Sequence, residues 1–207
     1  MRTLDAADPP PNPLAERKEA QMPKQTQESA WDLSSSFAEW GIKRSLREYV
    51  LGTDDGTIEW IAPASDGRFP ATELLGRSPV DALWAVYDGA VRFRAHNSLM
   101  DVVVGSIAVE IGNGGAAISI AGLGSGGSAV FAEQEGSVSR AEVNGMIEIH
   151  IERPALTSRG AAFLGGVYSR GTLLDPLRLV LALDPSRAMA HDAGQQQSLN
   201  WTTEEKP

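Results

Sequence analysis

The segment "AVRFRAHNSLMDVVVGSIAVEI", residues 90–111, consists of two runs of β-branched and aromatic residues that flank a short polar stretch. This composition favours two strands with a turn between them. Runs of the same kind, separated by Gly, Asp and Pro, lie at residues 57–62, 83–88, 116–122, 128–133, 145–153 and 177–184. Short strands with frequent turn signals predict a mainly β domain, arranged as an antiparallel sandwich or barrel.

Residues 146–151, with the sequence "MIEIHI", alternate between isoleucine and another residue type. Successive side chains of a strand point to opposite faces of the sheet, so this alternation predicts a strand with one solvent-facing side. His150 falls on that side, and an exposed surface position is its default interpretation. Strands and helices do not alternate regularly along the chain, which disfavours a parallel, doubly wound fold.

One segment, "WGIKRSLREYV" at residues 40–50, has helical periodicity. Its apolar residues Ile42, Leu46, Tyr49 and Val50 recur at helical spacing, and most of its charged residues fall on the other side. A glycine follows soon after the last turn and is a plausible stop signal. The sequence therefore predicts one clear helix before the run of strands.

Ser45 and Tyr49 are four residues apart, so they lie one above the other on the same face of this helix. One interpretation is structural: a core tyrosine with its hydroxyl bonded to a carbonyl, beside a small serine that permits close packing. The other is functional: a phenol directed into a pocket and supported by the serine hydroxyl. A phenol becomes a useful anionic ligand beside a strong Lewis acid such as Fe(III). Periodicity alone favours the structural interpretation.

The composition divides the chain into three regions. Residues 1–30 and 186–207 are polar and poor in large apolar side chains, so we expect both tails to be disordered. Residues 31–185 form the predicted folded domain. The N-terminal region lacks the apolar core of a secretory signal, and no apolar run is long enough to span a membrane. These features predict a cytoplasmic protein.

Charge and cysteine content exclude several classes of protein. The chain has 27 acidic and 18 basic residues, a net charge of −9 at pH 7, whereas nucleic-acid-binding proteins usually present a basic face. There are no cysteines, so disulfides, thiolate metal sites and cysteine nucleophiles are all excluded. Nucleic acid is therefore not an expected partner.

Two further motifs have better structural than functional explanations. The stretch "GLGSGG" at residues 122–127 satisfies the glycine pattern of dinucleotide-binding loops, but no amphipathic helix follows it. A hairpin or loose loop is the favoured interpretation. The three histidines, His96, His150 and His191, do not lie in a nucleophile-elbow or metalloprotease pattern.

Three blocks of the sequence together resemble the HtaA-type (Htaa) domain, a haem-binding module of actinobacterial haem-uptake proteins. They are "WGIKRSLREYV" from Trp40, "GAVRFRAHNSLMDVVVGSIAVEI" from Gly89, and "LTSRGAAFLGGVYSRGTLLDPLRLVLALD" from Leu156. They occur in the family's order and span nearly the whole predicted domain. The resemblance implies an antiparallel β-sandwich-like single domain whose one or two short helices help to form a pocket for haem b.

The resemblance also implies a role for each matching residue. Tyr49 matches the axial ligand of the haem iron, and Ser45 matches its companion one turn earlier. His96 matches the histidine that hydrogen-bonds the tyrosine oxygen without binding iron. Val167 and Tyr168 fall on a Phe-Tyr pair that packs on the haem, so an aliphatic side chain replaces one aromatic contact.

The expected function is that of a non-enzymatic protein that captures, buffers or relays ferric haem through an axial tyrosinate. Tyrosinate is a hard oxygen donor that ligates haem iron in known proteins and favours Fe(III). Its partners would be haem and another haem-transfer protein, and the resemblance implies an extracellular or cell-surface location. The alternative is a β-sandwich interaction module that has lost haem binding. It is motivated by Val167, which removes an aromatic contact, and by "AHNS" at residues 95–98, which replaces a more glycine-rich turn around the histidine. A haem enzyme ranks last because the sequence offers no distal acid–base group.

Overall fold

The computed structural model describes residues 31–76, 82–121 and 128–184. In these ranges the chain forms eleven strands and two short helices, α1 (Arg44–Leu51) and α2 (Ser158–Phe163). The strands in chain order are β1 (Trp31–Glu39), β2 (Thr57–Ile61), β3 (Arg68–Leu75), β4 (Leu83–Ala95), β5 (Met100–Gly112), β6 (Gly115–Ile120), β7 (Ala129–Glu135), β8 (Ser139–Val143), β9 (Met146–Ile151), β10 (Ala155–Leu156) and β11 (Leu177–Leu183).

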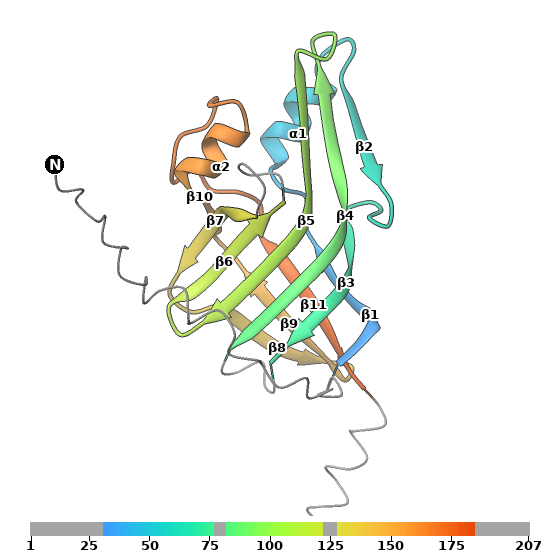
Figure 1. The fold of residues 1–207 in the computed structure, drawn as a ribbon, viewed down its shortest axis with the longest axis vertical. Helices are drawn as coiled ribbons and strands as arrows, with labels where there is room; N and C mark the ends of the chain where they lie inside the picture. Colours follow the sequence, from blue (N-terminus) through green and yellow to red (C-terminus); the bar gives the residue numbers. More distant parts are fainter. Residues whose placement is uncertain (1–30, 77–81, 122–127, 185–207) are drawn as a thin grey trace, which may run out of the picture.

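All strands belong to one antiparallel sheet that curls around a shared core (Figure 1). Its order is β10-β7-β6-β5-β4-β3-β1-β11-β9-β8, with β2 attached to β4 outside this path. Buried side chains from both halves of the sheet, such as Ile118 of β6 and Leu181 of β11, join one hydrophobic cluster. The predicted mainly β, antiparallel domain with one or two short helices is confirmed.

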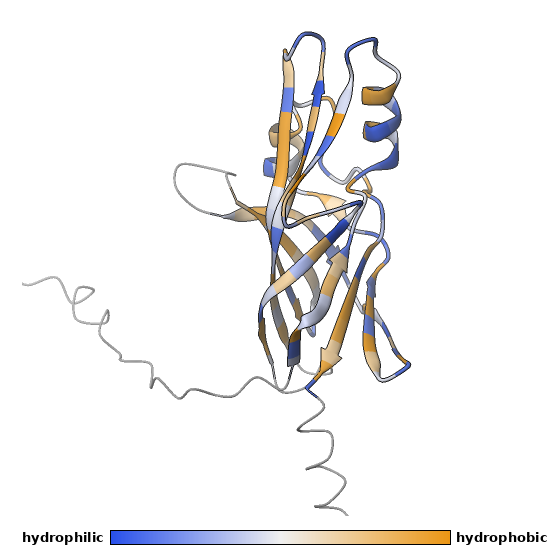
Figure 2. Cartoon of the chain, turned by 90° about the vertical axis from the view of Figure 1, so that its right-hand side faces the viewer, coloured by the Kyte–Doolittle hydropathy of each residue, from blue (hydrophilic) through white to orange (hydrophobic). Residues whose placement is uncertain are grey.

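Hydrophilic and hydrophobic residues follow each other along many of the strands (Figure 2). In β9, Ile149 and Ile151 are fully buried, whereas Glu148 and His150 are only partly buried. The alternation predicted for this strand is therefore confirmed. Neither helix in the described ranges is long and apolar enough to cross a membrane.

Strands β4 and β5 form a long hairpin whose outer half, with β2 beside it, extends beyond the other strands of the sheet (Figure 1). β3 pairs with the first part of β4, up to Tyr87, and β2 pairs with the second part, from Ala90 onward. Gly89 lies at the change of register between them, with φ of 89°. A side chain there would meet the backbone nitrogen of Ala64 at 2.3 Å, so only glycine fits this crossing.

The runs expected as separate strands at residues 83–88 and 90–96 are thus one strand that continues through a glycine bulge. The outer half of the hairpin places its turn, residues 96–99, next to the loop that follows α1. This extension positions the candidate site.

The predicted helix begins later than its periodicity indicated. Trp40 directly follows β1, and its backbone N–H donates to the carbonyl of Gly67 at 2.8 Å. Ile42 has φ of 65°, a left-handed conformation that no helix continues, so α1 starts only at Arg44. The helical assignment of residues 40–43 was wrong, because their backbone is not helical; Trp40 and Ile42 are nevertheless buried in the core.

Tyr87 lies in β4 with its side chain completely buried, and its hydroxyl has no hydrogen-bond partner among the described residues. Burial raises the pKa of this tyrosine well above its ordinary value, so it stays neutral. A buried hydroxyl without a partner has lost its bonds to water and gained none in return.

Replacing Tyr87 by Phe is therefore expected to leave stability unchanged or to raise the free energy of unfolding by about 1 kcal/mol. The ring and its packing stay, and the unsatisfied hydroxyl is removed. Urea unfolding of both proteins, with equal m-values, would measure the change. A loss of stability greater than about 1 kcal/mol would show that the hydroxyl is hydrogen-bonded in solution, for example to a buried water.

Two predicted features lie outside the residues that the structure describes. These are the disordered tails at residues 1–30 and 186–207, which include His191, and the glycine-rich stretch at residues 122–127. The predictions for these residues remain predictions. All described residues lie within the predicted domain of residues 31–185.

Candidate functional site

Helix α1 buries Leu46 and Val50, whereas Ser45 and Tyr49 lie on an exposed flank of the helix. The side chain of Tyr49 is 52% exposed. The apolar face predicted from periodicity therefore included one residue too many, because Tyr49 does not lie with the buried residues of the helix. This position excludes the structural interpretation of Tyr49 as a core residue.

The hydroxyl of Tyr49 lies 2.6 Å from Nε2 of His96, a hydrogen-bonding distance. The two rings are tilted by 53°, with their centroids 5.8 Å apart. Either the phenol O–H donates to an unprotonated Nε2, or an Nε2–H donates to the oxygen of the phenol or phenolate. The fold thus joins two residues that are 47 positions apart in sequence, and both had been predicted as site residues.

His96 stands at the start of the turn between β4 and β5. His96, Asn97 and Ser98 have φ values of 56°, 54° and 65°, so three consecutive residues with side chains adopt the left-handed conformation. The turn is closed by the N–H of Leu99, which donates to the carbonyl of His96 at 3.1 Å. This backbone sends the imidazole of His96 towards α1.

Asp55, in the loop between α1 and β2, also contacts this turn. Its Oδ1 accepts a hydrogen bond from the backbone N–H of His96 at 2.9 Å, and its Oδ2 accepts one from the backbone N–H of Asn97. The hydrogen bond from Asn97, opposed by partial desolvation and aided by the one from His96, lowers the pKa of Asp55 below its ordinary value. The carboxylate is therefore ionised at neutral pH and can accept at both oxygens.

Sequence reasoning missed Asp55. It belongs to the stretch "TDDGT", residues 53–57, which reads as an ordinary turn between a helix and a strand. An aspartate in such a turn usually bonds its own neighbours, and nothing in the local sequence indicates a partner about 40 residues away. Only the pairing of β2 with β4 brings this loop to the turn at His96.

Ser45 lies one turn before Tyr49 and is exposed. In the described ranges its hydroxyl makes no hydrogen bond. The predicted neighbourhood of Ser45 and Tyr49 on one flank of the helix is thus present. The structure assigns Ser45 no bonded partner there.

Val167 and Tyr168 lie in the loop after α2. Val167 is 75% exposed, whereas Tyr168 is half-buried and packs against the edge of the core. Nζ of Lys43 lies 5.2 Å from the ring centroid of Tyr168 and also donates to the carbonyl of Leu173 at 3.0 Å. Tyr168 therefore lies beside Lys43, at the start of α1, whereas Tyr49 lies in the second half of that helix.

An open hollow of about 500 Å³ lies between the outer part of β5 and α2. Among the described residues, positions 100–104 of β5 pair only with β4. On the other side of β5, the N–H of Ala121 donates to the carbonyl of Gly105 at 3.3 Å, and pairing with β6 begins at Ile107. The lining is mostly small or apolar: Ala90, Asp101, Val102, Val103, Gly105, Ser106, Ala121 and Phe163. Phe163 is held in place by an edge-on contact with Phe131, with the centroids 6.0 Å apart.

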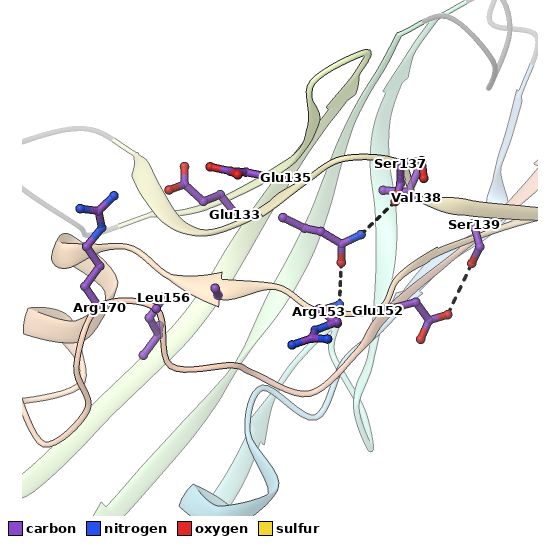
Figure 3. Close-up of a pocket in the computed structure, with 12 residues that line it drawn as sticks. Glu133, Glu135, Ser137, Val138, Ser139, Glu152, Arg153, Leu156 and Arg170 are labelled. Carbon is purple, nitrogen blue, oxygen red and sulfur yellow. Dashed lines mark hydrogen bonds between the residues drawn. The ribbon is translucent and has the colours of Figure 1, made fainter.

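A larger hollow of about 690 Å³ lies at the seam where β7 and β10 approach β8 and β9 (Figure 3). Its charged side chains, including Glu133, Glu152 and Arg170, do not converge on one point in Figure 3. Gln134 bridges the seam, because its Nε2 donates to Ser137 at 3.2 Å and its Oε1 accepts from the N–H of Arg153 at 2.5 Å. The described residues contain no group of three side chains able to hold a metal ion.

Comparisons with known proteins agree on one family and one fold. The sequence model of the family described as Htaa matches residues 35–180. The structure is similar to the N-terminal domain of HtaA from Corynebacterium glutamicum, with a TM-score of 0.56 and 21% identity over 74% of this chain and 99% of that domain. It is also similar to the C-terminal domain of the same protein, with a TM-score of 0.56 and 16% identity over 72% and 96% of the two chains. No curated protein matches the chain.

Proposed function

Because the chain belongs to the Htaa family, we propose that it is a non-enzymatic protein that binds ferric haem through Tyr49 and buffers or relays it. The family is associated with haem uptake and is not an enzyme family. The single observation that carries the proposal for this chain is the contact between the Tyr49 hydroxyl and Nε2 of His96 at an exposed position. Haem is the cargo of this site.

The chemistry of the Tyr49–His96 pair fits a ferric haem. A phenolate is a hard, anionic oxygen donor that ligates haem iron and favours Fe(III) over Fe(II). A ring N–H from His96 would hold the second lone pair of that oxygen and fix the orientation of the phenol. Since Tyr49 is half-exposed, its oxygen can meet a large ligand without opening the core.

A hollow on the hairpin that carries His96 also suits a flat, apolar ligand, although neither Tyr49 nor His96 lines it. The hollow beside β5 is lined mainly by valine, alanine and phenylalanine side chains, and Val103 on its rim is partly exposed. Burial of apolar porphyrin surface would contribute roughly 25 cal/mol per Å² before the costs of association. In the proposal, Ser45 supports the phenol from the preceding turn, and Val167 and Tyr168 cover the ligand from the loop after α2.

The direct test is titration of the apo-protein with hemin, followed by the Soret band. We expect a saturable band at one equivalent, with the spectrum of a phenolate-bound ferric haem. The ligand that co-purifies with the protein from its native host would be extracted and analysed to identify it as haem b. No saturable binding would leave the interaction module as the surviving function, which the exposed aliphatic side chain of Val167 favours.

Replacing His96 by Ala is expected to weaken hemin binding by about 1–3 kcal/mol while the phenolate-type spectrum persists. The variant loses the hydrogen bond that orients the Tyr49 oxygen, but it keeps the ligand. Affinity and spectrum would be measured in the same titration.

His150→Ala is a matched control, because His150 is the other histidine of the described ranges and lies on β9, near Glu148 at 3.4 Å. This variant should bind hemin like the wild type. A wild-type spectrum with two axial protein ligands that changes to one in His96→Ala would make His96 an iron ligand and would contradict its assigned role.

A further inference from the structure

The loop after α1 and the turn of the β4–β5 hairpin meet at Asp55. Its two carboxylate oxygens accept from two consecutive backbone N–H groups, those of His96 and Asn97. The carboxylate bonds the backbone of the turn, whereas the imidazole of His96 is bonded to Tyr49. Asp55 therefore bonds the backbone of His96, and its own loop directly follows the helix that carries Tyr49.

The loop that carries Asp55 is fastened to the last turn of α1. Backbone N–H of Gly52 donates to the carbonyl of Glu48 at 3.0 Å, and the hydroxyl of Thr53 donates to the carbonyl of Val50 at 2.8 Å. At Gly56 a side chain would meet the carbonyl oxygen of Val50 at 1.7 Å, so the chain passes directly against the helix end. Asp55 thus has a fixed position relative to Tyr49.

The turn at His96 needs such a support. Left-handed backbone is unfavourable for residues with a side chain, and here it occurs at His96, Asn97 and Ser98 in succession. Such a conformation persists only where the surrounding structure holds it. Among the described residues, Asp55 is the residue outside the hairpin that hydrogen-bonds the backbone of this turn.

We propose that Asp55 is the positioning residue of the Tyr49–His96 pair: its carboxylate holds the left-handed turn so that Nε2 of His96 meets the phenol oxygen. Its effect on haem binding rests on the function proposed above, whereas its effect on the pair does not. Asp55 acts through the backbone of His96 and Asn97 and makes no hydrogen bond to the phenol of Tyr49.

The test replaces Asp55 by Asn, which keeps the shape of the side chain but can accept at only one of its two terminal atoms. Asp54→Asn is the matched control, because this neighbouring carboxylate is exposed, carries the same charge and makes no hydrogen bond or ion pair in the described ranges. Circular dichroism and the melting temperature would verify that both variants fold.

The first readout uses the apo-protein and needs no haem. In Asp55→Asn the backbone N–H groups of His96 and Asn97 should exchange with solvent about tenfold faster or more. The ¹⁵N shift of the His96 Nε2 should move towards that of a free imidazole. Asp54→Asn should change neither. An unchanged His96 ring shift in Asp55→Asn would overturn the proposal.

The second readout is hemin affinity in a double-mutant cycle with His96→Ala. Asp55→Asn should weaken binding in the wild-type background and have no further effect in the His96→Ala background, because it acts through His96. An equal loss in both backgrounds would overturn the proposal. A wild-type protein that binds no hemin would refute the proposed function only, and the apo measurements would still decide the role of Asp55.

Discussion

Replacing Tyr49 by Phe is expected to lower the affinity for ferric haem by more than about 100-fold, since losing even the hydrogen-bond partner of a metal ligand costs roughly 10- to 100-fold. The substitution removes one oxygen atom and keeps the aromatic ring. Tyr49 is half-exposed and its ring is not part of the buried cluster, so the fold should be unaffected. Hemin titration and the loss of the phenolate-type spectrum measure the effect.

The matched control is Tyr87→Phe, which also removes one hydroxyl from an aromatic ring. Tyr87 is buried in β4, where its hydroxyl cannot reach a ligand. Hemin affinity should fall only in Tyr49→Phe. Equal hemin affinity of the wild type and Tyr49→Phe would show that Tyr49 is not the haem ligand. Haem would then have to bind elsewhere, for example in the hollow beside β5.

The predicted fold succeeded where strands carry their own composition signal. β5 and β11 are rich in valine, isoleucine and leucine, and the runs at residues 99–111 and 177–184 predicted both within one residue of their bounds. β1 was missed, because its sequence "WDLSSSFAE" has three serines and low strand propensity. It is a strand because it pairs with β3 on one side and β11 on the other, and those partners are distant in sequence.

Different reasoning located different parts of the site. Helical periodicity placed Ser45 and Tyr49 on one flank, but it could not pair Tyr49 with His96, since no local pattern connects two segments 47 residues apart. Only the resemblance to the Htaa family supplied that pairing. Neither approach identified Asp55. Its hydrogen bonds go to backbone N–H groups, which nearly every residue type has, so the sequence of the turn gives no sign of them.

The block that contains Tyr49 also contains Trp40, a core residue that holds the chain just before α1. Trp40 is 2% exposed, and its ring meets that of Phe131 edge-on with the centroids 6.0 Å apart. Its Nε1 donates to the backbone carbonyl of Asp175 at 3.0 Å. The carboxylate of Asp175 in turn accepts from the backbone N–H of Arg44 at 2.8 Å, which satisfies the first turn of a helix whose N-cap residue offers no side-chain bond.

Replacing Trp40 by Ala is therefore expected to lower the free energy of unfolding by about 3–5 kcal/mol, a large part of the roughly 5–15 kcal/mol of a typical domain. The variant leaves a large cavity and removes the hydrogen bond to Asp175. Urea unfolding measures the loss. The control is Trp60→Ala, since Trp60 is only partly buried and contacts Phe69 edge-on at 5.9 Å.

Trp60→Ala should cost clearly less, because part of its ring already faces solvent. A Trp40→Ala protein as stable as Trp60→Ala would contradict the anchoring role. Substitutions at the two ends of this block are expected to reduce haem binding for different reasons. Trp40→Ala should lose haem binding only as far as it unfolds, whereas Tyr49→Phe should lose it while fully folded, because Trp40 holds the helix and Tyr49 presents the ligand atom.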